Sequence, residues 1–196
     1  MFKMPEKIVS ERIVLVRPNP PTFELAKEIF EKVELSRNTL RDWLPWVDGT
    51  KTAEDEFSGW LINWCKKHWE EGKGFAYVIR DKKTKGLLGA IDLMEYDETN
   101  KSALIGYWLS DDAVGYGYMT EAVFALEAEG FKRGLNRIVI TNDVKNIRSA
   151  NVPKRCGYHL DGITRQDRWD NRWKSFRDTN VWSKLKSEWQ AEQKKG

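Results

Sequence analysis

The first half of the chain spaces its apolar residues in two ways, which predict a strand followed by helices. Residues 11–17 form a short β-branched run, as expected for a strand. After Thr22, apolar residues recur at intervals of three or four, which predicts a helix capped by that threonine. Residues 36–47 predict a further short helix. Thr52 and Asp55 match a capping box ahead of an apolar helical stripe.

The middle of the chain has the pattern of a meander. Three strands are expected at residues 75–80, 87–95 and 103–109. The connections between them, 82–86 and 97–101, are short and rich in turn-forming residues. Neighbouring strands are therefore expected to be antiparallel.

The last part of the chain mixes both periodicities. The elements expected there are a loop at 110–116, a helix after it, a strand at 137–141, a helix at 146–155, and strands at 158–165 and 178–184. Asp170 and Asn171 predict a turn, and the charged tail 184–196 is expected to fray. This order of elements predicts an α/β (α+β) fold, a mixed sheet with helices on its faces.

Composition narrows the class of protein. A length of 196 residues suits one domain, 1–196, with a core at about 11–183. The net charge of +3 excludes a protein that binds polyanions strongly over its whole surface. No apolar stretch approaches the ~20 residues of a membrane span. The N-terminus does not resemble a secretory signal. Cys65 and Cys156 lie far apart, so no disulfide framework and no metal site is predicted, and a cytoplasmic setting is expected.

One segment, residues 107–123, carries a pattern that points to chemistry. A strand runs into a loop with Gly115 and Gly117, and the loop opens directly into a helix. Glycines let successive backbone N–H groups turn toward one point, and the helix N-terminus adds partial positive charge. The pattern therefore predicts an anion site suited to a pyrophosphate, and a simple tight turn is the alternative.

The same segment resembles the acetyl-CoA-binding motif of the GNAT superfamily of N-acetyltransferases, within its RimJ/RimL-like branch. The resemblance is carried by Gly-Tyr-Trp-Leu at 106–109, Gly-Tyr-Gly-Tyr-Met-Thr-Glu-Ala at 115–122, Leu-Arg-Asp-Trp-Leu-Pro-Trp at 40–46 and Asn-Ile-Arg-Ser-Ala-Asn-Val at 146–152. It covers about residues 11–183. It implies a mostly antiparallel central sheet, splayed in the middle to hold acetyl-CoA as cosubstrate.

The chain departs from the superfamily pattern at three positions. Val114 stands where the cofactor loop usually begins with Gln or Arg. Pro153 stands where many members carry a tyrosine general acid, and Thr141 where many carry a glutamate. These departures weaken the general mechanism of the superfamily more than the assignment to the branch.

The resemblance assigns roles to particular residues. The cofactor-binding set is Tyr107, Trp108, Leu109, Val114, Gly115, Tyr116, Gly117, Tyr118, Met119, Thr120, Asn146 and Ser149. Ser149 matches the serine that gives a proton to the leaving thiolate, and Asp161 matches an acidic residue proposed as base. Asp92, in the middle of an apolar strand, is a second candidate base. The simpler alternatives are that Asn146 only caps its helix and that Asp161 is an ordinary turn residue.

Tryptophans mark the candidate acceptor side. Trp43 and Trp46 lie in the helical segment that, by resemblance, roofs the acceptor groove. Trp169 lies in a mixed-charge segment, 165–172, that borders either the acceptor or solvent.

The function expected from this resemblance is acetyl transfer from acetyl-CoA to an amine, with a protein N-terminus as the first candidate acceptor. A small amine, such as an amino acid, polyamine or antibiotic, is the nearest alternative, and a CoA-binding sensor without activity is another. No membrane is expected as a partner. A nucleic acid is not expected as a direct partner either, because acidic residues interleave the Arg/Lys/Trp stretch at 165–186. The resemblance also suggests a homodimer.

Overall fold

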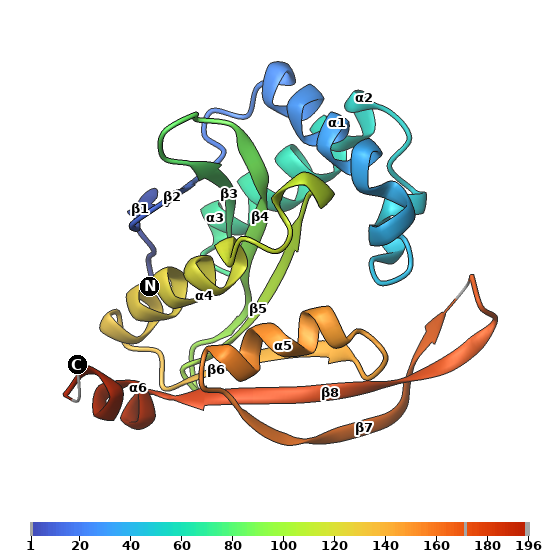
Figure 1. Ribbon diagram of the computed structural model, residues 1–196. Coiled ribbons are helices and arrows are strands. Elements are labelled where there is room, and N and C mark those ends of the chain that lie inside the picture. The colour runs from blue at the N-terminus through green and yellow to red at the C-terminus, as the bar shows by residue number, and fades with distance from the viewer. Residues whose placement is uncertain (1, 171, 195–196) are drawn as a thin grey trace.

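The computed structural model describes residues 2–170 and 172–194 and consists of one eight-stranded sheet with helices on both faces (Figure 1). The strand order is β1-β2-β3-β4-β5-β6-β8-β7. All neighbouring strands are antiparallel except β5 and β6, which run parallel. The expected mixed, mostly antiparallel sheet is therefore confirmed.

The N-terminal half of the sheet contains the predicted meander. Its strands are β1 (Lys7–Val9), β2 (Ile13–Val16), β3 (Phe75–Asp81), β4 (Leu87–Asp97) and β5 (Ser102–Leu109). Sequence patterning missed β1, whose three residues are too short to show alternation. It also made β2 longer than the four residues that pair with β1 and β3.

The C-terminal half of the sheet separates from the first half along the chain. Its strands are β6 (Arg137–Asp143), β8 (Ser175–Leu185) and β7 (His159–Asp170). β5 pairs with β6 only from Ser102 to Ile105, opposite Arg137 to Ile140. Beyond these residues β6 pairs only with β8, so β5 and β6 part, and the place where they part is called the opening below. This parting is the splay of the sheet expected from the resemblance.

The outer strand β7 is irregular. Its pairing with β8 shifts between Leu160 and Gly162 and again between Thr164 and Arg168. Gln166, inside the second shift, has a positive φ of 51°. The expected turn after Asp170 involves Asn171, which lies outside the described residues.

The helices bury two separate apolar clusters, one on each face of the sheet. On one face lie α1 (Phe23–Leu40), η1 (Pro45–Asp48), α2 (Ala53–Glu56) and η2 (Phe57–Lys66). α3 (Lys67–Glu71) continues η2, and its Trp69 packs against the cluster of the other face. On the other face lie α4 (Tyr118–Lys132), α5 (Ile147–Arg155) and α6 (Lys186–Gln193). The predicted caps at Thr22 and Thr52 are both present. The predicted helix at 36–47 is instead the end of α1 followed by η1, because Pro45 begins a new turn.

The C-terminal segment corrects one expectation. β8 continues to Leu185 and α6 follows it, so residues 184–193 are packed rather than frayed. Lys184 is fully buried, and its Nζ lies 3.0 Å from Glu127 Oε1, 2.6 Å from Glu192 Oε2 and 2.9 Å from the Cys156 carbonyl. These contacts join α4, α5 and α6. The ion pairs of Lys184 therefore attach the C-terminal segment to the core. The last two residues of the predicted tail lie outside the described residues.

Lys184→Met is expected to lower the free energy of unfolding by about 3 kcal/mol, because it leaves the buried Glu127 carboxylate without its cation. Urea denaturation at neutral pH measures this loss. Lys186→Met, in the first turn of α6, is the matched control and is expected to change stability by less than about 0.5 kcal/mol. Equal stabilities of the two variants would show that the buried pair contributes nothing.

Two further searches of the described residues bear on function. None of the helices in residues 2–170 and 172–194 is both long and apolar enough to cross a bilayer. The same residues contain no cluster of three or more His, Cys, Asp or Glu side chains placed to hold a metal ion.

Candidate active site

The loop between β5 and α4 presents a row of free backbone amides. Gly115 and Gly117 have φ angles of 95° and 81°, in the region that favours glycine. Gly117 is the N-cap of α4, and no side chain caps that helix end. Within the described part of the chain, the amides of residues 115–120 donate to no protein acceptor. The loop therefore has backbone donors that a phosphate group could accept from, and the cofactor-binding role stays a prediction.

Arg12, which sequence reasoning missed, holds this loop from behind. Its Nη1 donates to the Tyr116 carbonyl at 2.9 Å, and its Nε and backbone N–H each donate to the Glu121 carboxylate at 2.8 Å. The guanidinium also lies 5.0 Å from the ring centroid of Tyr118. These contacts keep the Tyr116 carbonyl turned away from the row of amides. No local motif could reveal them, because Arg12 lies more than 100 residues earlier in the chain.

The side chains around the loop differ in what they offer a cofactor. Val114, where the superfamily places Gln or Arg, is exposed and has no polar group to offer. Arg155 of α5 donates from Nε to Thr120 Oγ1 at 3.1 Å and brings a cation to the start of α4. Met119 is buried in the apolar core, so only its backbone amide faces outward.

The wall of the opening on the β5 side carries Tyr107, Trp108 and Leu109. Tyr107 and Leu109 pack against the cluster under α4, while Trp108 belongs to the opposite face. The Tyr107 hydroxyl lies 3.1 Å from the Ser149 carbonyl oxygen and 3.2 Å from Ser149 Oγ. The structure thus joins two predicted site residues across the opening.

Ser149 lies in the first turn of α5. Asn146 Oδ1 accepts a hydrogen bond from the Ser149 N–H at 3.0 Å, so Asn146 is the N-cap of this helix. This is the alternative reading of Asn146, and it fixes the backbone of Ser149 at the edge of the opening. Pro153 lies inside the same helix.

Asp92 lies on β4 close to the point where the sheet opens. Its cross-strand neighbours are Ala76 and Gly106, which have little or no side chain to cover it. Its Oδ1 is buried and has no partner among the described residues, and desolvation raises the pKa of Asp92 to about 8. Its charge also raises the pKa of the buried thiol of Cys65. A carboxyl group in this state is mostly protonated at pH 7, and its ionised form, which can accept a proton, grows as the pH approaches 8.

Asp161 is in a different environment. It lies at the irregular start of β7, where its carboxylate pairs with Arg137 at 2.7 Å and accepts from Ser183 Oγ at 2.8 Å. Hydrogen bonds from Ser183, Arg137 and His159 outweigh desolvation and lower the pKa of Asp161. These contacts favour an ordinary structural acid over a general base, because a lowered pKa makes the carboxylate a poor proton acceptor.

Aromatic side chains line the face of the sheet that carries Asp92. Trp46 of η1 meets Trp108 edge to face with ring centroids 6.2 Å apart, and 39% of the Trp46 surface is exposed. The Arg177 guanidinium lies over the Trp43 ring, with its Cζ 5.0 Å from the centroid of that ring. Trp169 packs against Phe176 at 5.0 Å near the tip of the β7–β8 hairpin. Of the three predicted acceptor residues, Trp43 thus contacts Arg177, while Trp46 and Trp169 pack against other aromatic rings, and their acceptor role stays a prediction.

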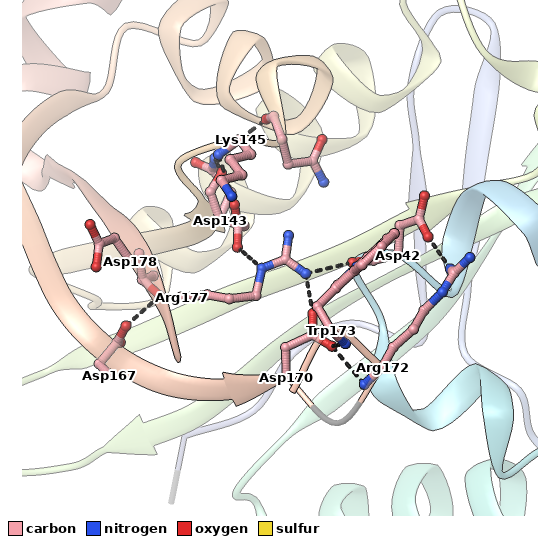
Figure 2. A network of polar contacts seen from close by, with 12 residues as sticks. Asp42, Asp143, Lys145, Asp167, Asp170, Arg172, Trp173, Arg177 and Asp178 are labelled. Atoms are coloured by element: carbon pink, nitrogen blue, oxygen red, sulfur yellow. Dashed lines mark hydrogen bonds and ion pairs between the residues drawn. The ribbon is translucent and has the colours of Figure 1, made fainter. Parts of the chain in front are cut away.

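That network joins the helical layer to the β7–β8 hairpin (Figure 2). Arg177 of β8 pairs with Asp143 at the end of β6 and with Asp170 of β7, and donates to the Asp42 carbonyl at 2.9 Å. Arg172 pairs with the Asp42 carboxylate. Because Asp42 follows α1 and Asp143 ends β6, the network connects the two halves of the molecule at the wide end of the opening. Sequence reasoning identified the mixed charge of this hairpin but not its partner.

Comparison with known proteins identifies the family. Residues 12–159 match the acetyltransferase (GNAT) domain. Over 160 residues the chain is 32% identical to the ribosomal-protein-serine acetyltransferase of Escherichia coli strain K12, which covers 81% of this chain and 86% of that protein. A solved structure of the microcin C7 self-immunity acetyltransferase MccE, in complex with acetyl-CoA and AMP, is 25% identical with a TM-score of 0.81 and covers 90% of this chain and 93% of that one.

The fold is also shared with RimL, a ribosomal alpha-N-protein acetyltransferase solved in complex with coenzyme A. Its TM-score is 0.82 at 24% identity, over 92% of this chain and 98% of that one. The family match covers most of the chain. The chain belongs to the GNAT acetyltransferase domain family and is an N-acetyltransferase.

Proposed function

We propose that this enzyme transfers the acetyl group of acetyl-CoA to the α-amine of a protein N-terminus. The observation that carries the proposal is the row of free amides at residues 115–120, which leads into the opening between β5 and β6. The similarity to a ribosomal-protein-serine acetyltransferase supports the acceptor class.

The residues present fit acetyl-CoA, which supplies an activated thioester. The amides of 115–120 would hold the phosphates, with Arg155 adding positive charge beside Thr120. The backbone of Tyr107, Trp108 and Leu109, which β6 leaves unpaired on that side, would bind the pantetheine arm. Ser149 would stand at the edge of the same opening and donate a hydrogen bond to the departing sulfur.

We assign the base role to Asp92 rather than to Asp161. An α-ammonium group has a pKa of about 7.7–8.0, whereas a lysine side chain has one of about 10.4. Burial raises the pKa of Asp92 to about 8, which matches an α-ammonium and not a lysine. Proton transfer between groups of equal pKa is nearly isoenergetic, so Asp92 can release the amine for direct attack on the thioester carbonyl.

The acceptor would approach from the face that carries Trp46 and Trp108, between the helical layer and the β7–β8 hairpin. Trp43 lies at Arg177 of the polar network, and Trp169 packs against Phe176 on the β7–β8 hairpin. The choice of a terminal amine as acceptor is supported by the similarity to a ribosomal-protein-serine acetyltransferase.

Product mass spectrometry tests the proposal directly. The enzyme is incubated with acetyl-CoA and peptides that have a free N-terminus, the same peptides with a blocked N-terminus and an internal lysine, and a panel of small amines. We expect acetylation only of the free α-amines. Transfer to the small amines alone would move the acceptor to that class, and cofactor binding without any thiol release would identify a sensor.

A further inference from the structure

Helix α5 contains a proline whose effect falls on Ser149. Pro153 has no backbone N–H, so it cannot donate to the carbonyl four residues earlier in the helix. That carbonyl belongs to Ser149. A helical carbonyl that loses its donor inside a protein needs another partner, because leaving it unpaired costs about 1–3 kcal/mol.

Tyr107 supplies the missing donor from the other side of the opening. Its hydroxyl lies 3.1 Å from the Ser149 carbonyl oxygen, while its backbone belongs to β5. The same hydroxyl lies 3.2 Å from Ser149 Oγ. One phenol therefore contacts both the orphaned carbonyl and the side chain of the predicted acid.

The protonation state of Tyr107 decides which hydrogen bonds it makes. Burial raises the pKa of Tyr107 above its usual value, so the phenol keeps its proton throughout the physiological pH range. A carbonyl can only accept, so the phenol proton is directed to the Ser149 carbonyl. The phenol oxygen then has only lone pairs for Ser149 Oγ, and it accepts the serine hydrogen. This fixes the position of Oγ at the edge of the opening.

We propose that Tyr107 is the positioning residue for Ser149 in acetyl transfer, anchored on the carbonyl that Pro153 leaves free. This rests on the proposed function. Ser149 then needs only a small rotation to donate its hydrogen bond to the cofactor sulfur, which keeps the electron pair of the broken C–S bond. The chain has a proline where many superfamily members have a tyrosine, and a tyrosine from β5 contacts the same helix instead.

A double-mutant cycle tests this assignment. Tyr107→Phe, Ser149→Ala and the double variant are compared with the wild type for kcat and for the KM of acetyl-CoA. We expect Tyr107→Phe alone to lower kcat about fivefold to tenfold with KM changed less than about twofold, since one oriented hydrogen bond is lost. In the Ser149→Ala background the same change should have no further effect on kcat. Equal losses in both backgrounds, or a loss in KM alone, would overturn the assignment.

Tyr77→Phe is the matched control. Tyr77 is also a buried tyrosine, and it lies on β3, away from the opening. Its hydroxyl donates to the Pro5 carbonyl at 2.7 Å. It is expected to lower the melting temperature about as much as Tyr107→Phe while leaving kcat unchanged.

A stability measurement keeps the inference separate from the proposed function. Pro153→Ala returns a backbone N–H to the Ser149 carbonyl. In that background, Tyr107→Phe should lower the melting temperature less than it does in the wild type. An equal loss in both backgrounds would refute the carbonyl anchor even if the enzyme is active. A wild type inactive on every amine would refute the proposed function, and this measurement would still decide the anchor.

Discussion

Replacing Gly115 and Gly117 together with alanine is expected to weaken the binding of acetyl-CoA by about two orders of magnitude. Both positions have positive φ angles, of 95° and 81°, where a residue with a side chain costs about 1–2 kcal/mol. The strain of two such residues, about 2–4 kcal/mol, is relieved when the loop turns its amides away from the phosphates. Each 1.4 kcal/mol of that preference is tenfold in affinity. Isothermal titration calorimetry with acetyl-CoA measures the change.

A steric clash of the added Cβ atoms does not cause this loss of affinity. A glycine with the same backbone strain elsewhere in the chain can therefore serve as the control. A Cβ at Gly115 would meet nothing within 4 Å, and one at Gly117 would lie 3.6 Å from Arg12 Nη2. Gly134, after the end of α4, has a φ of 109° and the same open surroundings. Gly134→Ala is therefore expected to reduce stability by about as much as one of the two loop substitutions, about 1–2 kcal/mol, and to leave cofactor affinity unchanged. If the double variant binds acetyl-CoA as tightly as Gly134→Ala does, the amide row is not the phosphate site.

Asp92→Asn is expected to lower kcat/KM by about 10²- to 10³-fold and, at the same time, to raise stability. The loss of activity follows from removing the base that accepts the amine proton. In the wild type, kcat/KM should rise with pH as Asp92 and the acceptor α-amine both lose protons near pH 8, and the variant should keep only the rise that the amine causes. Burial raises the pKa of the Cys65 thiol, which interacts with Asp92, well above its usual value, so Cys65 stays neutral over this range. Burial also raises the pKa of Glu56 to about 7, so this carboxyl titrates within the range as well.

The change in stability has a definite sign. In the unfolded chain Asp92 ionises near pH 4, and in the folded protein near pH 8. Between these values the folded state binds more protons than the unfolded state, so the free energy of unfolding of the wild type falls as pH rises. Asp92→Asn removes this decline. The free energy of unfolding of the variant should therefore equal that of the wild type below pH 4 and exceed it by a few kcal/mol at pH 8. Urea denaturation at several pH values measures it.

Asp97, at the end of the same strand, is the matched control. It is only half-buried, and hydrogen bonds from Asn100 and Thr99 lower the pKa of Asp97, the opposite of Asp92. Its stabilising effect is present above its unfolded pKa and is lost as pH falls through the folded value. Asp97→Asn should therefore lower stability slightly at neutral pH and leave kcat/KM unchanged. A gain of activity or a loss of stability in Asp92→Asn would contradict the base assignment.

The parts of the fold that depend on neighbours in sequence were predictable. The meander, the helix caps at Thr22 and Thr52 and the glycine-flanked loop with its anion site each need only a few consecutive residues to define them. The splay of the sheet and the identity of the cofactor as acetyl-CoA came from the family resemblance. The three-residue strand β1 and the π-helical winding of η2 have no such local pattern.

The parts of the site that depend on tertiary contacts were not predictable from the residues alone. Arg12 reaches Tyr116, Tyr107 reaches Ser149 and Arg172 reaches Asp42 over separations of 104, 42 and 130 residues. Asp161 matched the motif of a base, but its pairing with Arg137 could be seen only once β6 and β7 were placed. A motif gives the residue types, and the tertiary neighbours decide the proton affinity and orientation of each one.

The irregular pairing of β7 has a consequence for solubility. A long outermost strand normally offers its unpaired amides and carbonyls as a template on which another chain can extend the sheet. In β7 the two interruptions, together with the left-handed backbone at Gln166, break that template into short pieces. Charged side chains, among them Arg165 and Arg168, also lie along it. Edge-to-edge polymerisation is thereby disfavoured, and any self-association would have to use another surface of the molecule.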